Sequence, residues 1–278
     1  MFAQVPGPIG IFDSGYGGLT IFDKIRKRMP AYDYIYLGDN ARTPYGPRSF
    51  DVVYQFTRQA VERLFEEGCQ LIILACNTAS AKALRTIQQQ DLPRWDADRR
   101  VLGVIRPTVE VLGELSRTRH IGILGTTGTI SSQSYTLEIE KLFPDMTVTS
   151  EACPMWVPLV ENNEYDSPGA DYFIRKHLDH ILAADPQIDT LVLGCTHYPL
   201  LWDKIKQFIP QHIHVLAQGE YVAASLENYL MRHPEMEARL TKGSQSRFMT
   251  TESEEKFAEA ASLFLQDPVE VSQITIEG

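Results

Sequence analysis

The sequence predicts an α/β protein made of two similar α/β domains, whose mostly parallel sheets are related by pseudo-twofold symmetry. Two pairs of matching segments predict this fold. Residues 71–78 are similar to residues 191–197, because each is an apolar run of strand length followed by a small residue, a cysteine and polar side chains. Residues 9–15 are likewise similar to residues 121–127. Both pairs are roughly 110–120 residues apart, which is the length of a domain rather than of a solenoid repeat.

Strand and helix signals alternate along the first half of the chain. Apolar runs bounded by glycine or polar residues predict strands over residues 5–12, 34–37 and 71–75. Amphipathic spacing predicts helices over residues 19–28 and 50–67. Gly68 is the stop signal of the second helix. The third strand is apolar on both faces, which favours a parallel sheet that helices cover on each side.

The second half repeats this alternation and then adds a tail. Similar patterns predict strands over residues 121–124 and 191–193, and helices over residues 131–142 and 173–184. A final section, beginning with residues 216–229, contains predicted strands at 247–250 and 269–276 and a predicted helix at 257–266. Thr251 and Glu254 have the spacing of a capping box before that helix. The tail has no counterpart after the first repeat, so we expect it to pack against the first half.

Composition limits the classes of partner. The chain has 278 residues, of which 44% are hydrophobic and 22% charged, and this is enough for two domains with a sizeable core. A net charge of −10 argues against nucleic acid and against an anionic membrane surface. No segment approaches the ~18 apolar residues of a membrane span, and residues 1–10 have no signal-peptide pattern. The four cysteines are too scattered for a disulfide framework, so we expect a cytoplasmic protein with reduced thiols.

Residues 88–100 contain proline and several aspartates, and we expect them to form an exposed loop. Elsewhere, polar side chains directly follow four predicted strands, at Asp13, Asp39, Cys76 and Cys195. In open α/β sheets, ligands bind beyond the carboxyl ends of the strands. The sequence therefore predicts a small-molecule site with one thiol from each half, in which one thiol accepts a proton and the other donates one.

Cys76 and Cys195 are candidate acid/base groups. A free thiol is a few per cent ionised at neutral pH, so a modest pKa shift suits it to either role. A position just before a helix would also favour the thiolate. Buried cysteine is otherwise often a small hydrophobic residue, and this is our expectation for Cys69 and Cys153. The matching positions of Cys76 and Cys195 in the repeat favour a chemical role for these two.

Other polar residues allow more than one interpretation. His197 is either a partner that tunes Cys195 or a structural histidine. Asp13 and Asp39 are either functional carboxylates or helix N-caps. Zinc is disfavoured because no second pair of ligands accompanies Cys195 and His197 at zinc-site spacing.

A dinucleotide fingerprint is incomplete, since Thr20 stands where the third glycine belongs. A Cys-His-Asp hydrolase would leave one of the two cysteines in matching positions without a role.

Five segments resemble the signature blocks of the glutamate racemases, in the aspartate/glutamate racemase family. The resemblance spans residues 8–228, and its blocks occur in the family's order at residues 13–20, 38–46, 75–80, 153–161 and 194–201. It implies a racemase without cofactor or metal that interconverts L-glutamate and D-glutamate and supplies D-glutamate for peptidoglycan synthesis. It also implies that the active site lies in the cleft between a first domain, 1–104 plus 218–278, and a second domain, 105–217.

The resemblance implies a role for individual residues as well. Cys76 and Cys195 would be the two acid/base catalysts on opposite faces of the substrate Cα. Asp13, Glu161 and His197 would assist the thiols. The substrate would be held by Asp13, Ser14, Asp39, Tyr45, Gly46, Asn77, Thr78, Thr196 and His197.

Two departures from the family pattern, Arg106 and Gln218, concern regulation and subunit contacts more than chemistry. A homodimer is compatible with the sequence. An aspartate racemase, whose substrate is one methylene shorter, and an inactive small-molecule binding protein of the same fold are the alternatives.

Overall fold

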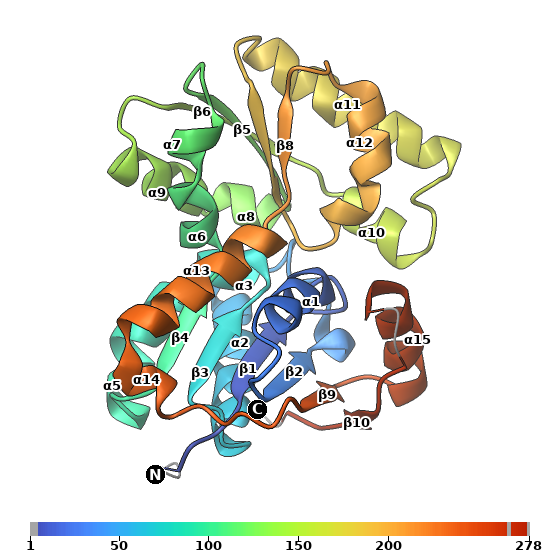
Figure 1. The fold of residues 1–278 in the computed structure, drawn as a ribbon. Helices are drawn as coiled ribbons and strands as arrows, with labels where there is room; N and C mark the ends of the chain where they lie inside the picture. Colours follow the sequence, from blue (N-terminus) through green and yellow to red (C-terminus); the bar gives the residue numbers. More distant parts are fainter. Residues whose placement is uncertain (1–4, 266–267, 277–278) are drawn as a thin grey trace.

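Two separate parallel sheets organise the chain in this computed structural model, which describes residues 5–265 and 268–276 (Figure 1). All pairings between the strands of the described residues are parallel. In spatial order, the six-stranded sheet consists of β10 (Val271–Gln273), β9 (Ser246–Thr250), β2 (Tyr34–Gly38), β1 (Ile9–Asp13), β3 (Leu71–Leu74) and β4 (Arg100–Gly103). The four-stranded sheet consists of β6 (Thr147–Ala152), β5 (His120–Gly125), β7 (Thr190–Gly194) and β8 (His214–Leu216).

The two sheets share one strand order. In the first sheet β1 lies between β2 and β3, and β4 follows β3. In the second sheet β5 lies between β6 and β7, and β8 follows β7. Strand for strand, the repeat seen in the sequence is therefore a repeat of topology, and the predicted α/β fold with parallel sheets is confirmed. β1, β3 and β7 are buried along their whole length, and for β3 this confirms the prediction from its apolar sequence.

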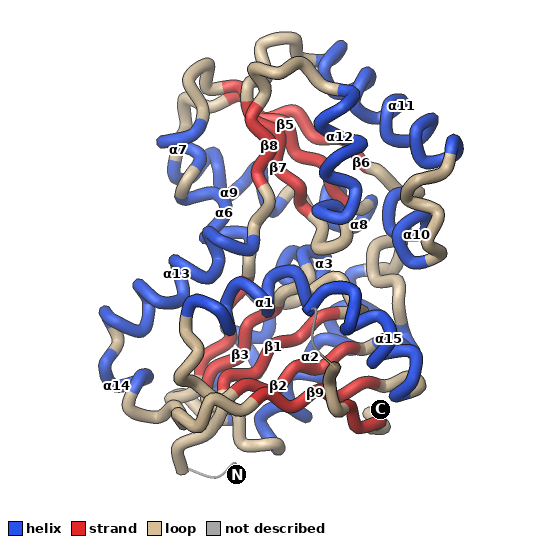
Figure 2. The backbone as a smooth tube through the Cα atoms, turned by 45° about the vertical axis from the view of Figure 1, so that its right-hand side comes forward, coloured by secondary structure: helices blue, strands red, loops and turns tan. Residues whose placement is uncertain are grey.

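Helices cover both faces of each sheet (Figure 2). The part of the chain that forms the six-stranded sheet contains α1 (Leu19–Arg28), η1 (Asn40–Arg42), α2 (Phe50–Glu66), α3 (Asn77–Lys82), α4 (Leu84–Thr86), η2 (Ile87–Asp91), α5 (Leu92–Trp95), α13 (Gly219–Arg232), α14 (Pro234–Glu237) and α15 (Glu254–Leu265). The other part contains α6 (Ile105–Glu110), α7 (Leu112–Leu115), α8 (Thr127–Ser131), α9 (Ser134–Leu142), α10 (Trp156–Glu161), α11 (Pro168–Ala184), η3 (Tyr198–Leu201) and α12 (Trp202–Phe208).

Four buried clusters form the core, one on each face of each sheet. On the first sheet, α1, α13 and α15 pack around Phe22 and Leu226 on one face, and α2 and α3 pack around Leu64 and Leu74 on the other. On the second sheet, α10, α11 and α12 cover one face, and α6 and α9 cover the other. The helix stop at Gly68 is confirmed, because this residue has φ +93°, a conformation that glycine adopts without a Cβ penalty.

The tail joins the first half, as expected. β9 pairs with β2 and β10 pairs with β9, so the tail extends the first sheet at its β2 edge. Phe257 and Ala261 of α15 are buried in the same core as α1. Gln266, the last residue of the helix predicted there, lies outside the described residues.

The exposure predicted for residues 88–100 is confirmed for most of them, but the predicted loop is wrong. These residues contain most of the π-helical turn η2, the short helix α5 and the start of β4. Asp91 accepts hydrogen bonds from Tyr54 Oη at 2.8 Å and Arg58 Nε at 3.2 Å, which tie the segment to α2. The proline lies in the first turn of α5, where its missing N–H is not needed. Tertiary contacts therefore outweigh the local turn composition.

The predicted capping box is also wrong. α15 begins at Glu254, and Ser253 Oγ accepts the N–H of Lys256 at 3.5 Å. Thr251 instead donates its hydroxyl to Asp39, at 2.9 Å. Among the described residues, no helix is both long enough and apolar enough to cross a membrane.

Candidate active site

A small cavity lies where the carboxyl ends of the two sheets meet. Its volume is about 140 Å³, which suits one small molecule, and both repeat cysteines reach it. The part of the chain with the six-stranded sheet contributes Ser14, Thr43, Pro44, Tyr45, Gly46, Pro47, Cys76, Asn77 and Thr78 to the lining. The part with the four-stranded sheet contributes Thr126, Thr127, Cys153, Pro154, Val157, Pro158, Cys195, Thr196 and His197.

Cys76 enters the cavity from the end of β3. It is the N-cap of α3, and its Sγ accepts the N–H of Ala79 at 3.4 Å while its thiol donates to Ser14 Oγ at 3.5 Å. Burial and the nearby Asp13 carboxylate raise the pKa of Cys76 to about 12, against the smaller lowering by those two hydrogen bonds. The predicted helix N-terminal position is thus confirmed, and the helix N–H lowers the pKa of Cys76 as expected. Burial outweighs this effect, so the thiol is protonated at neutral pH.

Cys195 enters from the end of β7 and has a different neighbour. Its Sγ lies 3.9 Å from His197 Nδ1, and His197 Nε2 lies 3.2 Å from Glu161 Oε1. Burial lowers the pKa of His197, but the contacts with Cys195 and Glu161 outweigh it and raise the pKa to about 10. The imidazole is therefore cationic at neutral pH, and Nδ1 can donate to the sulfur. The Cys195 sulfur, the His197 imidazole and the Glu161 carboxylate thus form one chain of contacts.

Two glycines allow the strand ends to approach so closely. A Cβ on Gly17 would lie 2.6 Å from His197 Nδ1 and would also overlap the Thr196 hydroxyl. A Cβ on Gly18 would overlap the side chain of Asp13. At Gly17 the glycine-rich loop before α1 therefore allows close contact between the two parts of the chain. Thr20 Oγ1 adds a hydrogen bond to the carbonyl oxygen of Thr196, at 3.2 Å.

Asp13 is fully buried behind the cavity. Its Oδ2 accepts the N–H of Gly15 at 3.0 Å, and its Oδ1 has no hydrogen-bond partner among the described residues. Burial raises the pKa of Asp13, while the charge of His197 and the N–H groups of Gly18 and Gly15 oppose this shift. Asp13 thus interacts with both sides of the site, through Cys76 and through His197.

Asp39 is held away from the cavity. Its carboxylate accepts hydrogen bonds from Tyr45 Oη, from Thr251 Oγ1 at 2.9 Å and from Arg42 Nε at 2.7 Å. These contacts occupy the carboxylate and fix the ring of Tyr45, which itself lines the cavity. The structure thus places Asp39 where it orients Tyr45.

Most polar side chains of the wall are uncharged. None of the described residues that line the cavity is lysine or arginine. Thr78 Oγ1 lies 3.0 Å from Thr126 Oγ1 and 3.3 Å from Thr129 Oγ1, and these hydroxyls join the two parts of the chain. An anionic ligand would be bound here by side-chain donors such as these hydroxyls. Such donors, fixed in advance in a site without bulk water, stabilise negative charge that develops during a reaction.

Comparison with known proteins identifies the family. The Asp/Glu/hydantoin racemase family model matches residues 10–262. A glutamate racemase of Paracoccus denitrificans (strain Pd 1222) is 39% identical over 271 residues, which cover 94% of this chain and 97% of that protein. The chain belongs to the Asp/Glu/hydantoin racemase family.

Solved structures of family members match over nearly the whole length. The crystal structure of a glutamate racemase isoform from Bacillus anthracis has a TM-score of 0.88 and 33% identity, and the match covers 97% of this chain and 98% of that one. A glutamate racemase from Francisella tularensis, in complex with D-glutamate, has a TM-score of 0.86 and 30% identity, with 98% of each chain covered.

The structure brings most of the predicted site residues of this racemase-family chain to the cavity. Those that line it are Ser14, Tyr45, Gly46, Cys76, Asn77, Thr78, Cys195, Thr196 and His197. The other three, Asp13, Asp39 and Glu161, are not lining residues and contact lining residues from behind. Among the described residues, no cluster of three or more His, Cys, Asp or Glu side chains could hold a metal ion.

Sequence reasoning missed part of the wall. Thr126 and Thr127 stand at the positions that match Ser14 and Gly15 in the repeat, so the repeat itself contained the signal. Cys153, expected to be a core residue, is fully buried and also forms part of the cavity wall. The repeat gave no such signal for Val157 and Pro158, because apolar residues in a helix usually belong to the hydrophobic core.

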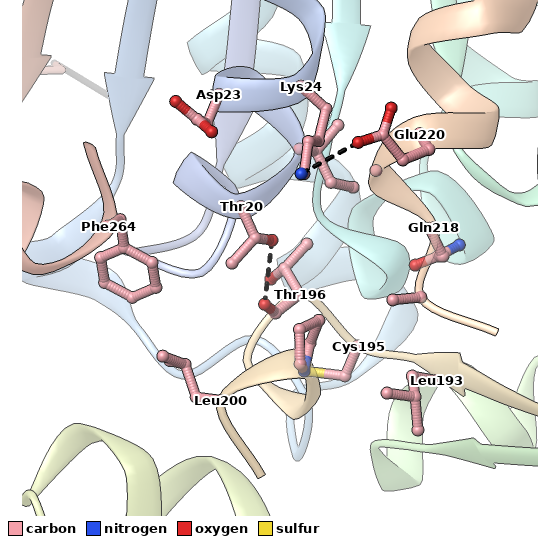
Figure 3. A pocket seen from close by; sticks show the side chains of 14 residues that line it. Thr20, Asp23, Lys24, Leu193, Cys195, Thr196, Leu200, Gln218, Glu220 and Phe264 are labelled. Atoms are coloured by element: carbon pink, nitrogen blue, oxygen red, sulfur yellow. Dashed lines mark hydrogen bonds and ion pairs between the residues drawn. The ribbon is translucent and has the colours of Figure 1, made fainter. Parts of the chain in front are cut away.

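Cys195 and Thr196 also border a second cavity (Figure 3). Its volume is about 310 Å³, and it is bordered by Thr20 and Lys24 of α1, by Gln218, and by Phe264 of α15. It is larger than the first cavity but contains only one of the two thiols. The smaller cavity, with both thiols, is therefore the candidate active site.

Proposed function

We propose that the protein interconverts L-glutamate and D-glutamate without a cofactor, with Cys76 and Cys195 as the two acid/base groups. The observation that carries this proposal is that both thiols reach one small cavity from the ends of equivalent strands, β3 and β7. Inversion at Cα needs one group that removes a proton and another that delivers one to the opposite face. Membership of a racemase family supports the same reaction type.

The substrate assignment rests on the relatives. The Paracoccus denitrificans and Bacillus anthracis proteins are named glutamate racemases, and the Francisella tularensis protein is described in complex with D-glutamate. In this chain, hydroxyl and amide groups from both sides of the cavity would hold the two carboxylates. The product, D-glutamate, would serve peptidoglycan synthesis.

The proton transfers follow from the two thiol environments. In the L-to-D direction Cys195 removes the α-proton, with His197 as its hydrogen-bond donor, and the protonated thiol of Cys76 delivers a proton to the other face. In the D-to-L direction Cys76 is the base, and its burial beside Asp13 opposes ionisation. The ammonium group of the bound substrate would offset part of this cost, since an opposite charge nearby favours the thiolate.

The weakly acidic α-proton demands a closed site. We propose that residues 1–104 with 218–278 and residues 105–217 act as two domains whose closure excludes water around the substrate. Closure would strengthen the N–H and hydroxyl contacts to the charge that develops on the substrate carboxylate. A homodimer stays a prediction, which sedimentation of the purified protein tests.

A chiral assay tests the function directly. Purified protein, dialysed against a chelator, is incubated with L-glutamate and separately with D-glutamate, and both enantiomers are followed by chiral chromatography. We expect both reactions to approach an equal mixture. Faster turnover of aspartate, measured as kcat/KM, would overturn the substrate assignment. Absence of both racemisation and α-deuterium exchange would favour the inactive binding protein of the same fold.

A further inference from the structure

A buried network of hydrogen bonds connects the cavity wall to a residue far along the chain. Asn77 follows Cys76 directly and lines the cavity. Its Nδ2 donates to Gln218 Oε1 at 2.6 Å, and its Oδ1 accepts from Tyr135 Oη at 2.7 Å. Gln218 Nε2 donates to the same Tyr135 oxygen at 2.7 Å, which closes a ring of three side chains. Asn77, Tyr135 and Gln218 are all buried.

The direction of these hydrogen bonds is fixed by a backbone carbonyl. Thr108 donates its one hydroxyl proton to the carbonyl oxygen of Val104 at 2.7 Å, so its oxygen must accept from Gln218, which lies at 2.7 Å. The same Gln218 nitrogen lies 3.5 Å from the Val104 oxygen, and a reversed amide would place two oxygens against each other there. Gln218 therefore presents nitrogen to α6 and oxygen to Asn77.

This direction passes on to Asn77. Because Gln218 offers an acceptor, Asn77 must present its NH₂ group to Gln218 and its oxygen to Tyr135. The tyrosine hydroxyl accepts from Gln218, so its own proton is free to donate to Asn77 Oδ1. One N–H of the Asn77 amide then has no partner in the network. The amide cannot flip without breaking both of its hydrogen bonds in a buried site, which is costly.

Gln218 lies at a point where the two parts of the chain meet. It connects β8 to α13, it borders the second cavity, and Figure 3 shows its side chain on the segment that passes above Cys195 and Leu193. Its partners come from both parts, since Asn77 belongs to α3 and Tyr135 to α9. The ring is therefore complete only when α3 and α9 are held together, as they are here.

We propose that Gln218 is a positioning residue that fixes the amide of Asn77, so that a donor rather than an acceptor faces a carboxylate of the substrate. This inference rests on the proposed function. Gln218 does not line the candidate active site, and within this network it reaches the wall of that cavity only through Asn77. Its effect should therefore appear in the binding of the substrate. Loss of a contact made equally in the ground state and the transition state raises KM and leaves kcat nearly unchanged.

The test uses two substitutions that remove hydrogen bonds with little change of volume. Gln218→Met deprives Asn77 of its acceptor, and Tyr135→Phe deprives it of its donor. We expect each variant to raise KM for glutamate about 10-fold and to change kcat less than ~3-fold. In an Asn77→Ala background, Gln218→Met should raise KM by less than ~2-fold further, because the amide that it positions is gone.

The matched control is Ser80→Ala, on the same helix. Ser80 Oγ donates to the Leu74 carbonyl oxygen at 2.8 Å and accepts from Val104 N, and among the described residues it forms no hydrogen bond with the Asn77 side chain. This control should lower the melting temperature without raising KM. If the wild type racemises glutamate and folded Gln218→Met and Tyr135→Phe keep its KM, the inference is overturned while the proposed function stands. An equal rise in KM with and without Asn77 would overturn it as well. A wild type that does not racemise glutamate contradicts the proposed function itself.

Discussion

The Cys76 side and the Cys195 side of the cavity occupy equivalent places in the two sheets but have unlike chemistry. Cys76 has a serine hydroxyl, a helix N–H and a carboxylate as neighbours. Burial and the carboxylate keep the thiol protonated, because they outweigh the two hydrogen bonds, which lower its pKa. Cys195 has a cationic imidazole, itself in contact with Glu161. The repeat determines where the thiols lie, whereas the loops after the strands differ and give the two thiols different neighbours.

The largest effect should come from removing either thiol. Cys76→Ala and Cys195→Ala should each lower racemisation at least 10²–10⁴-fold, the range typical of a general acid or base, because inversion needs both faces served. A Cys→Ser substitution at either position should also slow racemisation severely, since a hydroxyl is a far weaker acid than a thiol. Turnover is measured on variants whose circular dichroism matches the wild type. Near-normal turnover of folded Cys76→Ala or Cys195→Ala would contradict the two-thiol account.

A smaller, one-sided effect should come from the imidazole. His197→Asn should lower kcat/KM about 10–10²-fold, less than loss of a proton-transfer group. Enantiomers have equal free energy, so kcat/KM must fall equally in both directions. The asymmetry should appear in the primary deuterium isotope effect, which should grow for L-glutamate, where Cys195 is the base.

The matched control is His177→Asn, a second buried histidine of the same part of the chain, which pairs with Glu151 at 2.6 Å instead of with a cavity residue. It should leave turnover and isotope effects unchanged. If the isotope effect of His197→Asn grows for D-glutamate instead, the assignment of bases to faces is reversed.

Those features of the two sides that depend on local sequence pattern could be predicted from the sequence. The strand ends, the two thiols and the order of elements follow from apolar runs and from the repeat. Three strands were not predicted, for identifiable reasons. β6 is an edge strand with a partly exposed polar sequence, β8 has only three residues, and β4 directly follows a stretch of turn-like composition.

Contacts between distant residues were beyond pattern reasoning. The hydrogen bond between Asn77 and Gln218 joins residues 141 positions apart. Gln218 could be identified only as a departure from a family pattern, and its partners could not be named. Arg106, the other departure, proves to be an exposed side chain that pairs with Glu110 and Glu138. The pKa of Cys76 also depends on burial that no local pattern reports.

The two remaining cysteines, Cys69 and Cys153, give a further contrast. Cys69→Ala and Cys153→Ala should each lower the free energy of unfolding by about 0.5–3 kcal/mol, because both side chains are fully buried. Turnover should change less than stability in both. Only Cys153 lines the cavity, so any rise in KM should be confined to Cys153→Ala. Denaturant unfolding and steady-state kinetics on the same samples check this, and a KM effect in Cys69→Ala would count against it.

The smallest effect concerns alkaline stability. The pKa of Cys76 is raised from 9.0 to about 12, so folding favours the protonated thiol. Its contribution is fully present below pH 9 and is lost as the pH rises toward 12, by up to about 1.4 kcal/mol per pH unit for one thiol. Between pH 8 and pH 10, Cys76→Ala should therefore lose less unfolding free energy than the wild type. An identical pH dependence in urea titrations would show that Cys76 is not a buried protonated thiol.

The most direct test of two separate acid/base groups is a single conversion followed in D₂O. Wild-type protein is mixed with L-glutamate that carries ordinary hydrogen at Cα, and both enantiomers are isolated early and examined by mass spectrometry. The account predicts that D-glutamate carries deuterium at Cα, because Cys76 delivers a solvent-derived hydron, while the remaining L-glutamate keeps its hydrogen. If the early D-glutamate instead retained the substrate's own hydrogen, one group would be serving both faces, and the account would be contradicted.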